Sequence, residues 1–204
     1  LGEKFIGKSN VALILGDNFF YGQNLSQMLL KSTRLKRGAK IVLHKVSKPE
    51  LYGVAKVSKS KIIKITEKPK KYVSDLAITG LYFFDNKVVE YSKKLKPSKR
   101  GEIEITDLLN KYKNNKKLSA DFIGRGGAWL DTGSVEDFYK TTAFVSAIEN
   151  RQGFKIACIE EIAFNNKWIN KKKIKDSIKF YGNCNYSNYL AKLIKWKLLL
   201  QVEL

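Results

Sequence analysis

Five consecutive apolar residues, Val11 to Leu15, are followed directly by a glycine and then by Asp17. A short unbroken apolar run of this kind predicts a β-strand that is buried on both faces and reaches the surface at its carboxyl end. The segment Ala128 to Gly133 has a similar pattern, because Asp131 follows three apolar residues. In open α/β sheets, ligands bind at the carboxyl ends of the strands. We therefore expect both aspartates to lie at a binding site.

The two aspartates are candidate ligands of a divalent cation. Mg²⁺ typically takes one or two protein carboxylates and completes its coordination with water and substrate phosphates. If Asp17 and Asp131 converge, they predict a metal site for phosphate chemistry. The alternative is that each aspartate only caps a strand or the turn that follows it.

The order of the apolar segments predicts an α/β fold. Apolar runs first alternate with a helix-like stretch, which is typical of a parallel sheet, and a hairpin and further strands follow. We therefore expect a Rossmann-like, mixed and mainly parallel sheet flanked by helices in residues 1–153. The predicted strands are 11–15, 39–46, 53–57, 62–66, 77–84 and 118–123, and the predicted helices are 25–32, 87–95, 106–114 and 134–150.

Residues 154–204 differ in character and predict a small helical region at the carboxyl end. Short helices are expected at 159–164, 170–180 and 187–196. The last segment, 196–204, is unusually apolar, and the sequence patterns assign it no role.

The net charge of +20 raises the alternative of a basic nucleic-acid-binding module. Only five of the 39 basic residues are arginine, which is the residue preferred for base readout and for bidentate phosphate contacts. The lysines are scattered, and their densest group, Lys171 to Lys179, lies on an amphipathic helix pattern. We therefore expect no nucleic-acid partner, although the positive field would attract anionic substrates.

The cysteines and the histidine exclude some other classes of site. Cys158 and Cys184 match no metal-ligand spacing and predict reduced thiols in a cytoplasmic protein. His44 is the only histidine, so neither a zinc site nor a catalytic triad is expected. No apolar run approaches the length of a membrane-spanning helix, so no membrane partner is expected.

Six short motifs occur in one order along the chain. They are LGDN-x-FYG at 15–22, LYGV at 51–54, EKP at 67–69, ITGLYFFD at 78–85, RGEIEITD at 100–107 and GRGGAWLDTG at 124–133. Each motif alone is a weak signal. Together they resemble the glucose-1-phosphate thymidylyltransferase family, and the similarity extends to about residue 194.

The resemblance implies the catalytic residues. Asp17 and Asp131 match the two aspartates with which this family binds Mg²⁺. Lys68 and Arg100 match the groups that hold the sugar phosphate.

The resemblance also implies the substrate-binding positions. The backbone of Leu15 and Gly16 matches the part of the family's site that approaches the nucleoside. The glucose pocket corresponds to Tyr52, Gly53, Glu67, Thr79, Gly80 and Tyr82.

The reaction implied by the resemblance is nucleotidyl transfer from dTTP to glucose 1-phosphate. It gives dTDP-glucose and pyrophosphate, requires Mg²⁺ as cofactor, and serves dTDP-rhamnose and polysaccharide biosynthesis. The family usually assembles as a homotetramer, so further copies of the chain are expected partners. The alternatives are a sister sugar nucleotidyltransferase that uses UTP or CTP, and a non-catalytic sensor of sugar phosphates.

One family element has no match in this sequence. It is a glycine-rich loop with an arginine, followed by a lysine, which together cradle the triphosphate. The only glycine cluster here, Gly124 to Gly127, belongs to the second aspartate motif. We therefore expect the sequence to be roughly the last two-thirds of such an enzyme. By itself we expect it to bind glucose 1-phosphate weakly and to catalyse no turnover.

Overall fold

The structure of the chain is a computed structural model. It describes residues 2–98 and 100–200, except for the side chains of residues 196–200. The contacts within the chain form two compact units, Leu1–Phe138 and Tyr139–Leu204. The predicted domain division after residue 153 stays a prediction. Of the apolar carboxyl end, residues 201–204 lie outside the described residues.

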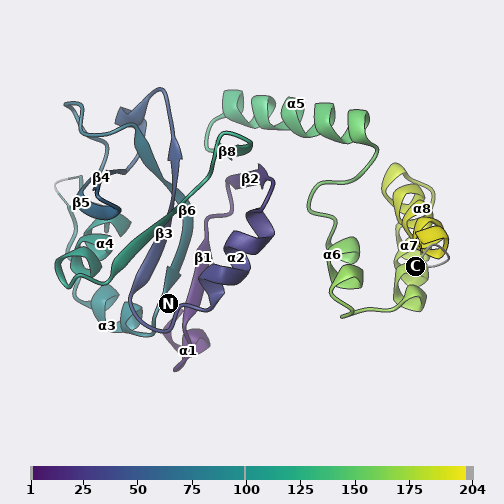
Figure 1. Cartoon of the computed structure of the whole chain (residues 1–204), viewed down its shortest axis with the longest axis horizontal. Helices are drawn as coiled ribbons and strands as arrows, with labels where there is room; N and C mark the ends of the chain where they lie inside the picture. Colours follow the sequence, from purple (N-terminus) through teal and green to yellow (C-terminus); the bar gives the residue numbers. More distant parts are fainter. Residues whose placement is uncertain (1, 99, 201–204) are drawn as a thin grey trace. The chain divides into compact units, whose positions relative to one another are not determined.

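The predicted strands and helices occur in the expected order in the first unit, with an additional strand at Asn18–Gly22, as Figure 1 shows. The strands are β1 (Val11–Ile14), β2 (Asn18–Gly22), β3 (Ala39–Lys45), β4 (Val54–Ser58), β5 (Lys61–Thr66), β6 (Leu76–Phe84), β7 (Leu118–Phe122) and β8 (Gly127–Asp131). The helices are α1 (Glu3–Ile6), α2 (Leu25–Thr33), α3 (Lys87–Lys93), α4 (Ile105–Asn114) and the start of α5 (Val135–Gln152), with a 3₁₀ turn η1 (Pro49–Leu51).

The main sheet of the described residues is mixed and has the order β5-β4-β6-β3-β7, with β1 also paired to β6. The predicted mixed α/β architecture is therefore confirmed, but the expectation that the sheet is mainly parallel is wrong for the described strand pairs. Among the described pairs, β3 and β7 run parallel, and the others are antiparallel. Strands β1 and β3 still point the same way, because each is antiparallel to β6, which lies between them.

Strand β6 is the centre of the sheet. Strand β3 follows one edge of β6, and β4 and β1 pair with different halves of its other edge. Gly80 lies between these two halves, so the chain can leave the sheet beside it after β1. This arrangement sets the position of the candidate site.

The prediction that the strand at 11–15 is buried on both faces is wrong. Leu13, Ile14 and Leu15 have exposed fractions of 40%, 57% and 41%. The physical reason is that, among the described residues, β1 pairs only with β6 and leaves its second edge open. An apolar run predicts a strand well, but it does not say how many neighbours that strand has.

Helices cover both faces of the sheet (Figure 1). Successive side chains of a strand point to opposite faces. One face, with Val42 and Phe83, packs against Met28 and Leu29 of α2. The opposite face packs against α3 and α4, from which Val88, Leu108, Leu109 and Tyr112 are buried.

The predicted hairpin is confirmed as β4 and β5. Lys59 and Ser60 occupy its two-residue turn, with φ angles of 47° and 61°. Positive φ at both central residues is typical of the two-residue hairpin turn whose twist matches the twist of the flanking strands.

Strands β2 and β8 form a separate two-stranded antiparallel ribbon. Strand β2 is not among the predicted strands, because its pairing partner lies far along the sequence. Helix α5 follows β8, and its predicted N-cap is confirmed, since the hydroxyl of Ser134 accepts a hydrogen bond from the Asp137 backbone N–H at 3.1 Å.

The second unit is helical, as predicted. It contains the rest of α5, α6 (Ile159–Asn165), α7 (Lys171–Tyr181) and α8 (Asn185–Leu200). Its core is built around Cys158, Ile174, Leu190 and Ile194. Among the described residues, no helix combines the length with the apolar character that crossing a bilayer requires.

Candidate functional site

The β2–β8 ribbon brings the two predicted aspartates together. In its register, Asn18 lies opposite Asp131, so Asp17 lies beside the end of β8. The backbone carbonyl of Asp17 accepts hydrogen bonds from both the backbone N–H and the hydroxyl of Thr132, each at 2.8 Å. Two residues more than a hundred positions apart are thus fixed side by side.

Gly133 shows how close the two carboxylates lie. A Cβ atom added to Gly133 would be 3.0 Å from Asp131 Oδ1 and 3.8 Å from Asp17 Oδ2. Oxygen atoms of both side chains therefore flank the same small space. The backbone N–H of Gly133 also donates to Asp131 Oδ1 at 2.7 Å, which fixes that carboxylate.

These two carboxylates fit a hard divalent cation. They are oxygen ligands that flank one small space, and like charges so placed repel each other unless a cation lies between them. Within residues 2–98 and 100–200, no group of three or more His, Cys, Asp or Glu side chains could hold a metal. A cation at this site would therefore need further ligands from a substrate or from water.

Asn18 connects the aspartates to the sheet, and sequence reasoning gave it no role. Its Nδ2 donates to Asp17 Oδ1 at 2.7 Å. Its Oδ1 accepts from Trp129 Nε1 at 2.6 Å and from the Gly80 N–H at 3.1 Å. The LGDN motif contains Asn18, but only the cross-chain register reveals its partners.

Gly80 lies where another group comes close to the strand, as a glycine inside a strand predicts. A Cβ atom there would lie 2.7 Å from the carboxamide of Asn18, so a side chain at this position would displace that carboxamide. The carbonyl of Gly80 accepts the Leu15 N–H at 2.9 Å. The close neighbour is a side chain of the protein itself, and it places the Leu15–Gly16 backbone next to the aspartates.

Tyr52, Gly53 and Glu67 form a second cluster on the same side of the unit. The Tyr52 ring meets Trp129 edge to face, with 5.0 Å between ring centroids. A Cβ atom on Gly53 would lie 2.9 Å from Thr106 Cγ2 and 3.0 Å from Glu67 Oε2. Gly53 is therefore the residue that lets the Glu67 carboxylate and α4 come together.

Two of the predicted pocket residues are buried. Thr79 is 0% exposed and its hydroxyl donates to the Val42 carbonyl at 3.0 Å. Its side chain supports the sheet, so a contact with a ligand would have to come from its backbone. Tyr82 is 3% exposed and stacks on Phe84, with ring centroids 6.0 Å apart.

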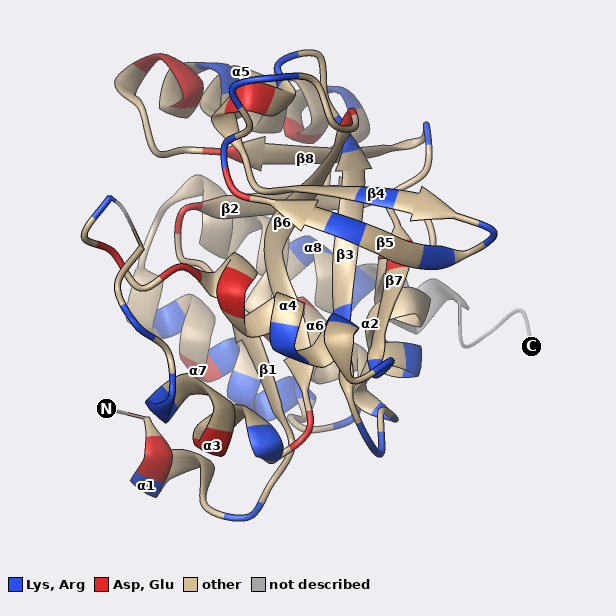
Figure 2. Cartoon of the chain, turned by 90° about the vertical axis from the view of Figure 1, so that its left-hand side faces the viewer, with Lys and Arg blue, Asp and Glu red and all other residues tan. Residues whose placement is uncertain are grey.

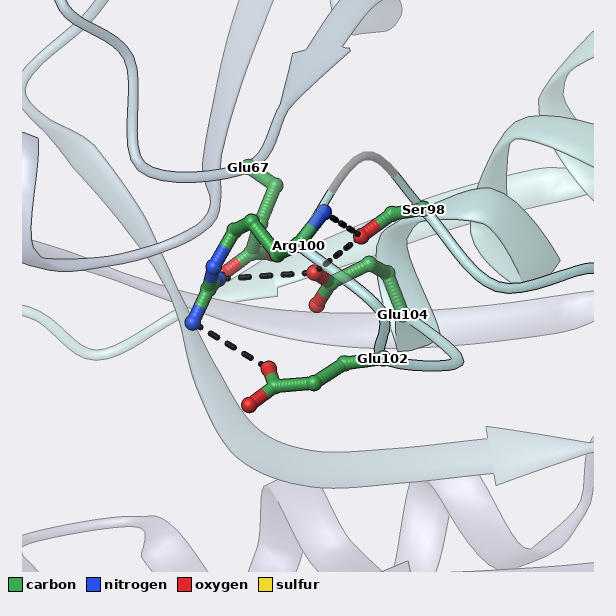
Figure 3. A network of polar contacts seen from close by, with 5 residues as sticks. All are labelled: Glu67, Ser98, Arg100, Glu102 and Glu104. Atoms are coloured by element: carbon green, nitrogen blue, oxygen red, sulfur yellow. Dashed lines mark hydrogen bonds and ion pairs between the residues drawn. The ribbon is translucent and has the colours of Figure 1, made fainter.

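Arg100 lies within a group of carboxylates, as Figure 3 shows. Its guanidinium is 3.1 Å from Glu102, 3.4 Å from Glu104 and 3.8 Å from Glu67. The hydroxyl of Ser98 accepts the Arg100 backbone N–H at 3.1 Å and donates to Glu104 at 3.0 Å, which shapes the loop.

Lys68 follows Glu67 and, like Arg100, is exposed. Its φ angle is 36°, and its N–H donates to the Tyr52 carbonyl at 3.1 Å. That bond ties the predicted Glu67–Lys68 pair to the Tyr52–Gly53 segment.

Burial raises the pKa of the Glu67 carboxyl above its ordinary value, and the negative charge of Glu104 acts in the same direction. The Thr106 hydroxyl, Lys68 and Arg100 oppose this shift. Burial also raises the pKa of Tyr82, with contributions from Glu67 and Asp17, so its phenol stays protonated at neutral pH. The electrostatic effect of both Glu67 and Asp17 on Tyr82 links the two clusters.

A pocket elsewhere in the first unit contains none of the predicted site residues. It has a volume of about 570 Å³ and lies between α2, β2 and the segment that joins β7 to β8. Phe20, Met28, Lys31 and Asp121 are among its lining residues.

Comparison with known proteins identifies the class to which this fold belongs. The family model described as nucleotidyl transferase matches residues 1–147. A UDP-glucose pyrophosphorylase structure complexed with UDP-glucose has a TM-score of 0.61 and 27% identity, covering 70% of this chain and 58% of that one. The chain therefore belongs to the nucleotidyl transferase family.

Within that family, curated relatives of the chain include glucose-1-phosphate thymidylyltransferases, as the resemblance predicted. The protein from Neisseria meningitidis serogroup A is 43% identical over 96% of this chain and 68% of its own length. The protein from Xanthomonas campestris is 40% identical over 96% of this chain and 66% of its own length. The chain thus spans about two thirds of the length of these relatives.

A solved structure assigned to the same enzyme agrees with these relatives. It comes from Bacillus anthracis, contains sucrose, and is 40% identical with a TM-score of 0.63. The match covers 70% of this chain and 57% of that one.

Proposed function

We propose that the protein acts in nucleotidyl transfer from dTTP to glucose 1-phosphate, which gives dTDP-glucose and pyrophosphate. The observation that carries the proposal is the convergence of Asp17 and Asp131 beside Gly133 in a chain of this family. Relatives named glucose-1-phosphate thymidylyltransferase support the choice of both substrates. They also favour dTTP over UTP, because the UDP-glucose pyrophosphorylase structure is less similar.

Asp17 and Asp131 would hold Mg²⁺. When bound, this ion supplies charge neutralisation and a template for the phosphate groups. Asp131 Oδ1 is fixed by the Gly133 N–H and Asp17 Oδ1 by Asn18, so each carboxylate keeps its second oxygen available.

The reaction itself needs no general base. The phosphate oxygen of glucose 1-phosphate is already anionic, and it would attack the α-phosphorus of dTTP in line and expel pyrophosphate. The task of the protein is then to place two anions next to each other and to stabilise the negative charge.

The second cluster would bind the sugar phosphate. The Glu67 carboxylate would accept hydrogen bonds from sugar hydroxyls, beside the backbone of Gly53 and Gly80. Lys68 and Arg100 would hold the phosphate. To do so, Arg100 would give up one of its carboxylate partners. Glu102 is the most exposed of the three carboxylates around Arg100 and would be the one replaced. The phenol of Tyr82, which stays protonated, would be a donor.

We also propose a cellular location and an oligomeric state for the enzyme. A cytoplasmic location fits the free thiols of Cys158 and Cys184. We also propose a homo-oligomer, following the family, and no nucleic-acid partner.

A binding experiment tests the site without requiring turnover. Mn²⁺ is added to the purified protein in place of Mg²⁺, and its affinity is measured by electron paramagnetic resonance. Glucose 1-phosphate is followed by ³¹P NMR, because a nearby Mn²⁺ ion broadens its phosphorus signal. We expect Asp131→Asn to weaken Mn²⁺ binding about tenfold or more and to abolish the broadening.

The matched control is Asp176→Asn, which changes an exposed aspartate of α7. It should behave like the parent protein in both measurements. Unchanged Mn²⁺ affinity and unchanged broadening in Asp131→Asn would remove Asp131 from the site. Equal broadening by glucose 6-phosphate would contradict the proposed substrate.

A further inference from the structure

Asn18 has a carboxamide whose orientation is fixed by chemistry. The two groups that face its Oδ1, Trp129 Nε1–H and the Gly80 N–H, can only donate hydrogen bonds. The oxygen must therefore face them, and the Nδ2 group must face Asp17. A flipped carboxamide would lose all three bonds.

This orientation determines which oxygen of Asp17 is free. Asn18 Nδ2 donates to Asp17 Oδ1 at 2.7 Å, so that oxygen is occupied. The other oxygen, Oδ2, is the one 3.8 Å from the Cβ position of Gly133, where Asp131 Oδ1 also lies close. The hydrogen bond thus turns the free oxygen of Asp17 toward Asp131.

Trp129 holds Asn18 in this position. It is 8% exposed, and its ring packs edge to face with both Tyr52 and His44, at centroid distances of 5.0 Å and 6.4 Å. An indole packed in this way has little freedom to move its N–H. The absence of a side chain at Gly80 leaves the space that the carboxamide occupies.

We propose that Asn18 is a positioning residue for the divalent cation of the proposed reaction. Anchored by Trp129 and Gly80, its carboxamide orients the Asp17 carboxylate before the cation arrives. The inference rests on the proposed function, because it assumes that Asp17 and Asp131 share one ion. Partners of metal ligands that fix ligand orientation commonly contribute ten- to a hundredfold to metal affinity.

The test measures Mn²⁺ affinity by electron paramagnetic resonance in the purified protein and two variants. Asn18→Leu keeps the side-chain size but removes all three hydrogen bonds, and it should weaken Mn²⁺ binding about tenfold or more. Trp129→Phe keeps an aromatic ring and removes the indole N–H together with part of the fused ring, and a loss of about two- to tenfold is expected. Trp168→Phe, at an exposed tryptophan of the second unit, should change nothing.

A second readout separates positioning from structural support. The indole ¹H–¹⁵N NMR signal of Trp129 should shift when Mg²⁺ is added, because Asn18 links the indole to Asp17. In Asn18→Leu the signal should remain visible but no longer respond to Mg²⁺. Melting temperatures measured without metal show how far each substitution lowers the stability of the fold. A purely structural role of Asn18 would lower stability in this way.

The outcomes distinguish this inference from the proposed function. If the parent protein binds no Mn²⁺, the proposed metal site fails and the inference fails with it. If the parent binds Mn²⁺ and Asp131→Asn does not, the site stands. Equal affinity of Asn18→Leu and Trp129→Phe with the parent would then overturn the role of Asn18 alone.

Discussion

Glu67 is a site carboxyl whose protonation differs from that of a free side chain. Burial raises its pKa above the ordinary value of 4.5, so the folded protein binds this proton more tightly than the unfolded chain does. The contribution of Glu67 to stability therefore falls as pH rises from that ordinary value through the raised one. At neutral pH the ionised carboxylate is retained at a cost in stability.

Replacing Glu67 by glutamine should consequently stabilise the protein while weakening sugar binding. We expect Glu67→Gln to melt at a higher temperature than the parent at about pH 7, with the difference shrinking toward about pH 4, where both side chains are neutral. Glucose 1-phosphate affinity should fall about tenfold or more, because a charged hydrogen-bond acceptor is lost. Melting curves and titration calorimetry measure the two effects.

Glu50→Gln provides the matched control at an exposed glutamate. It should leave sugar affinity unchanged and should not reproduce the pH-dependent gain in melting temperature. A Glu67→Gln protein that is less stable than the parent at neutral pH would show that its interactions with Arg100 and Thr106 outweigh burial.

Among individual residues, the sequence predicted the candidate metal ligands better than the residues that hold them in place. Asp17 and Asp131 were recognisable because each ends an apolar run, and the structure brings them together, whereas their metal role stays a prediction. Asn18 and Thr132 could not be predicted, because their partners become neighbours only through the β2–β8 register. Thr79 is buried because strands pair with both edges of β6, and the residue type alone does not predict that burial.

Among the elements, α4 carries a polar contact that locks it to the end of β6. The hydroxyl of Tyr112, a residue that is 0% exposed, donates to Asp85 Oδ1 at 2.8 Å. The Gly38 N–H donates to Asp85 Oδ2 at 2.6 Å. The buried carboxylate thus joins α4, β6 and the loop before β3.

We expect Tyr112→Phe to lower the free energy of unfolding by about 1–3 kcal/mol, because one oxygen of a buried carboxylate loses a donor. Chemical denaturation measures this change. Tyr72→Phe, at a tyrosine that is 77% exposed, is the control and should have no measurable effect. Equal stability of Tyr112→Phe and the parent would mean that the Asp85 carboxylate is satisfied without the phenol.

The elements show where pattern reasoning works and where it stops. Apolar runs and turn residues predicted the hairpin, strand β6 and the helices, because those signals are local. The exposure of β1 and the existence of β2 depend on which strands pair across long stretches of chain. Local patterns contain no such pairing information.

For the whole molecule, the dominant property is the net charge of +20. Figure 2 shows Lys and Arg spread over strands β4 and β5 and over helices such as α7, consistent with the scattered lysines of the sequence. A field of this kind favours small anions in general and selects no particular polymer.

Glucose 1-phosphate binding should therefore weaken as salt is added. Between about 0.01 M and about 0.15 M NaCl the screening length falls from about 30 Å to about 8 Å, and we expect a several-fold loss of affinity. Uncharged methyl α-glucoside, measured by NMR titration, should show no comparable change. An equal response of both ligands would exclude long-range attraction as a contributor.

The β2–β8 ribbon also has a consequence for the chain as a polymer. The hydrogen bond between Thr132 and Asp17 joins positions that are 115 residues apart. An ion shared by Asp17 and Asp131 would close that same large loop, and closing a loop removes conformational freedom mainly from the unfolded chain. The cofactor would then act as a reversible cross-link that stabilises most of the first unit whenever it is bound.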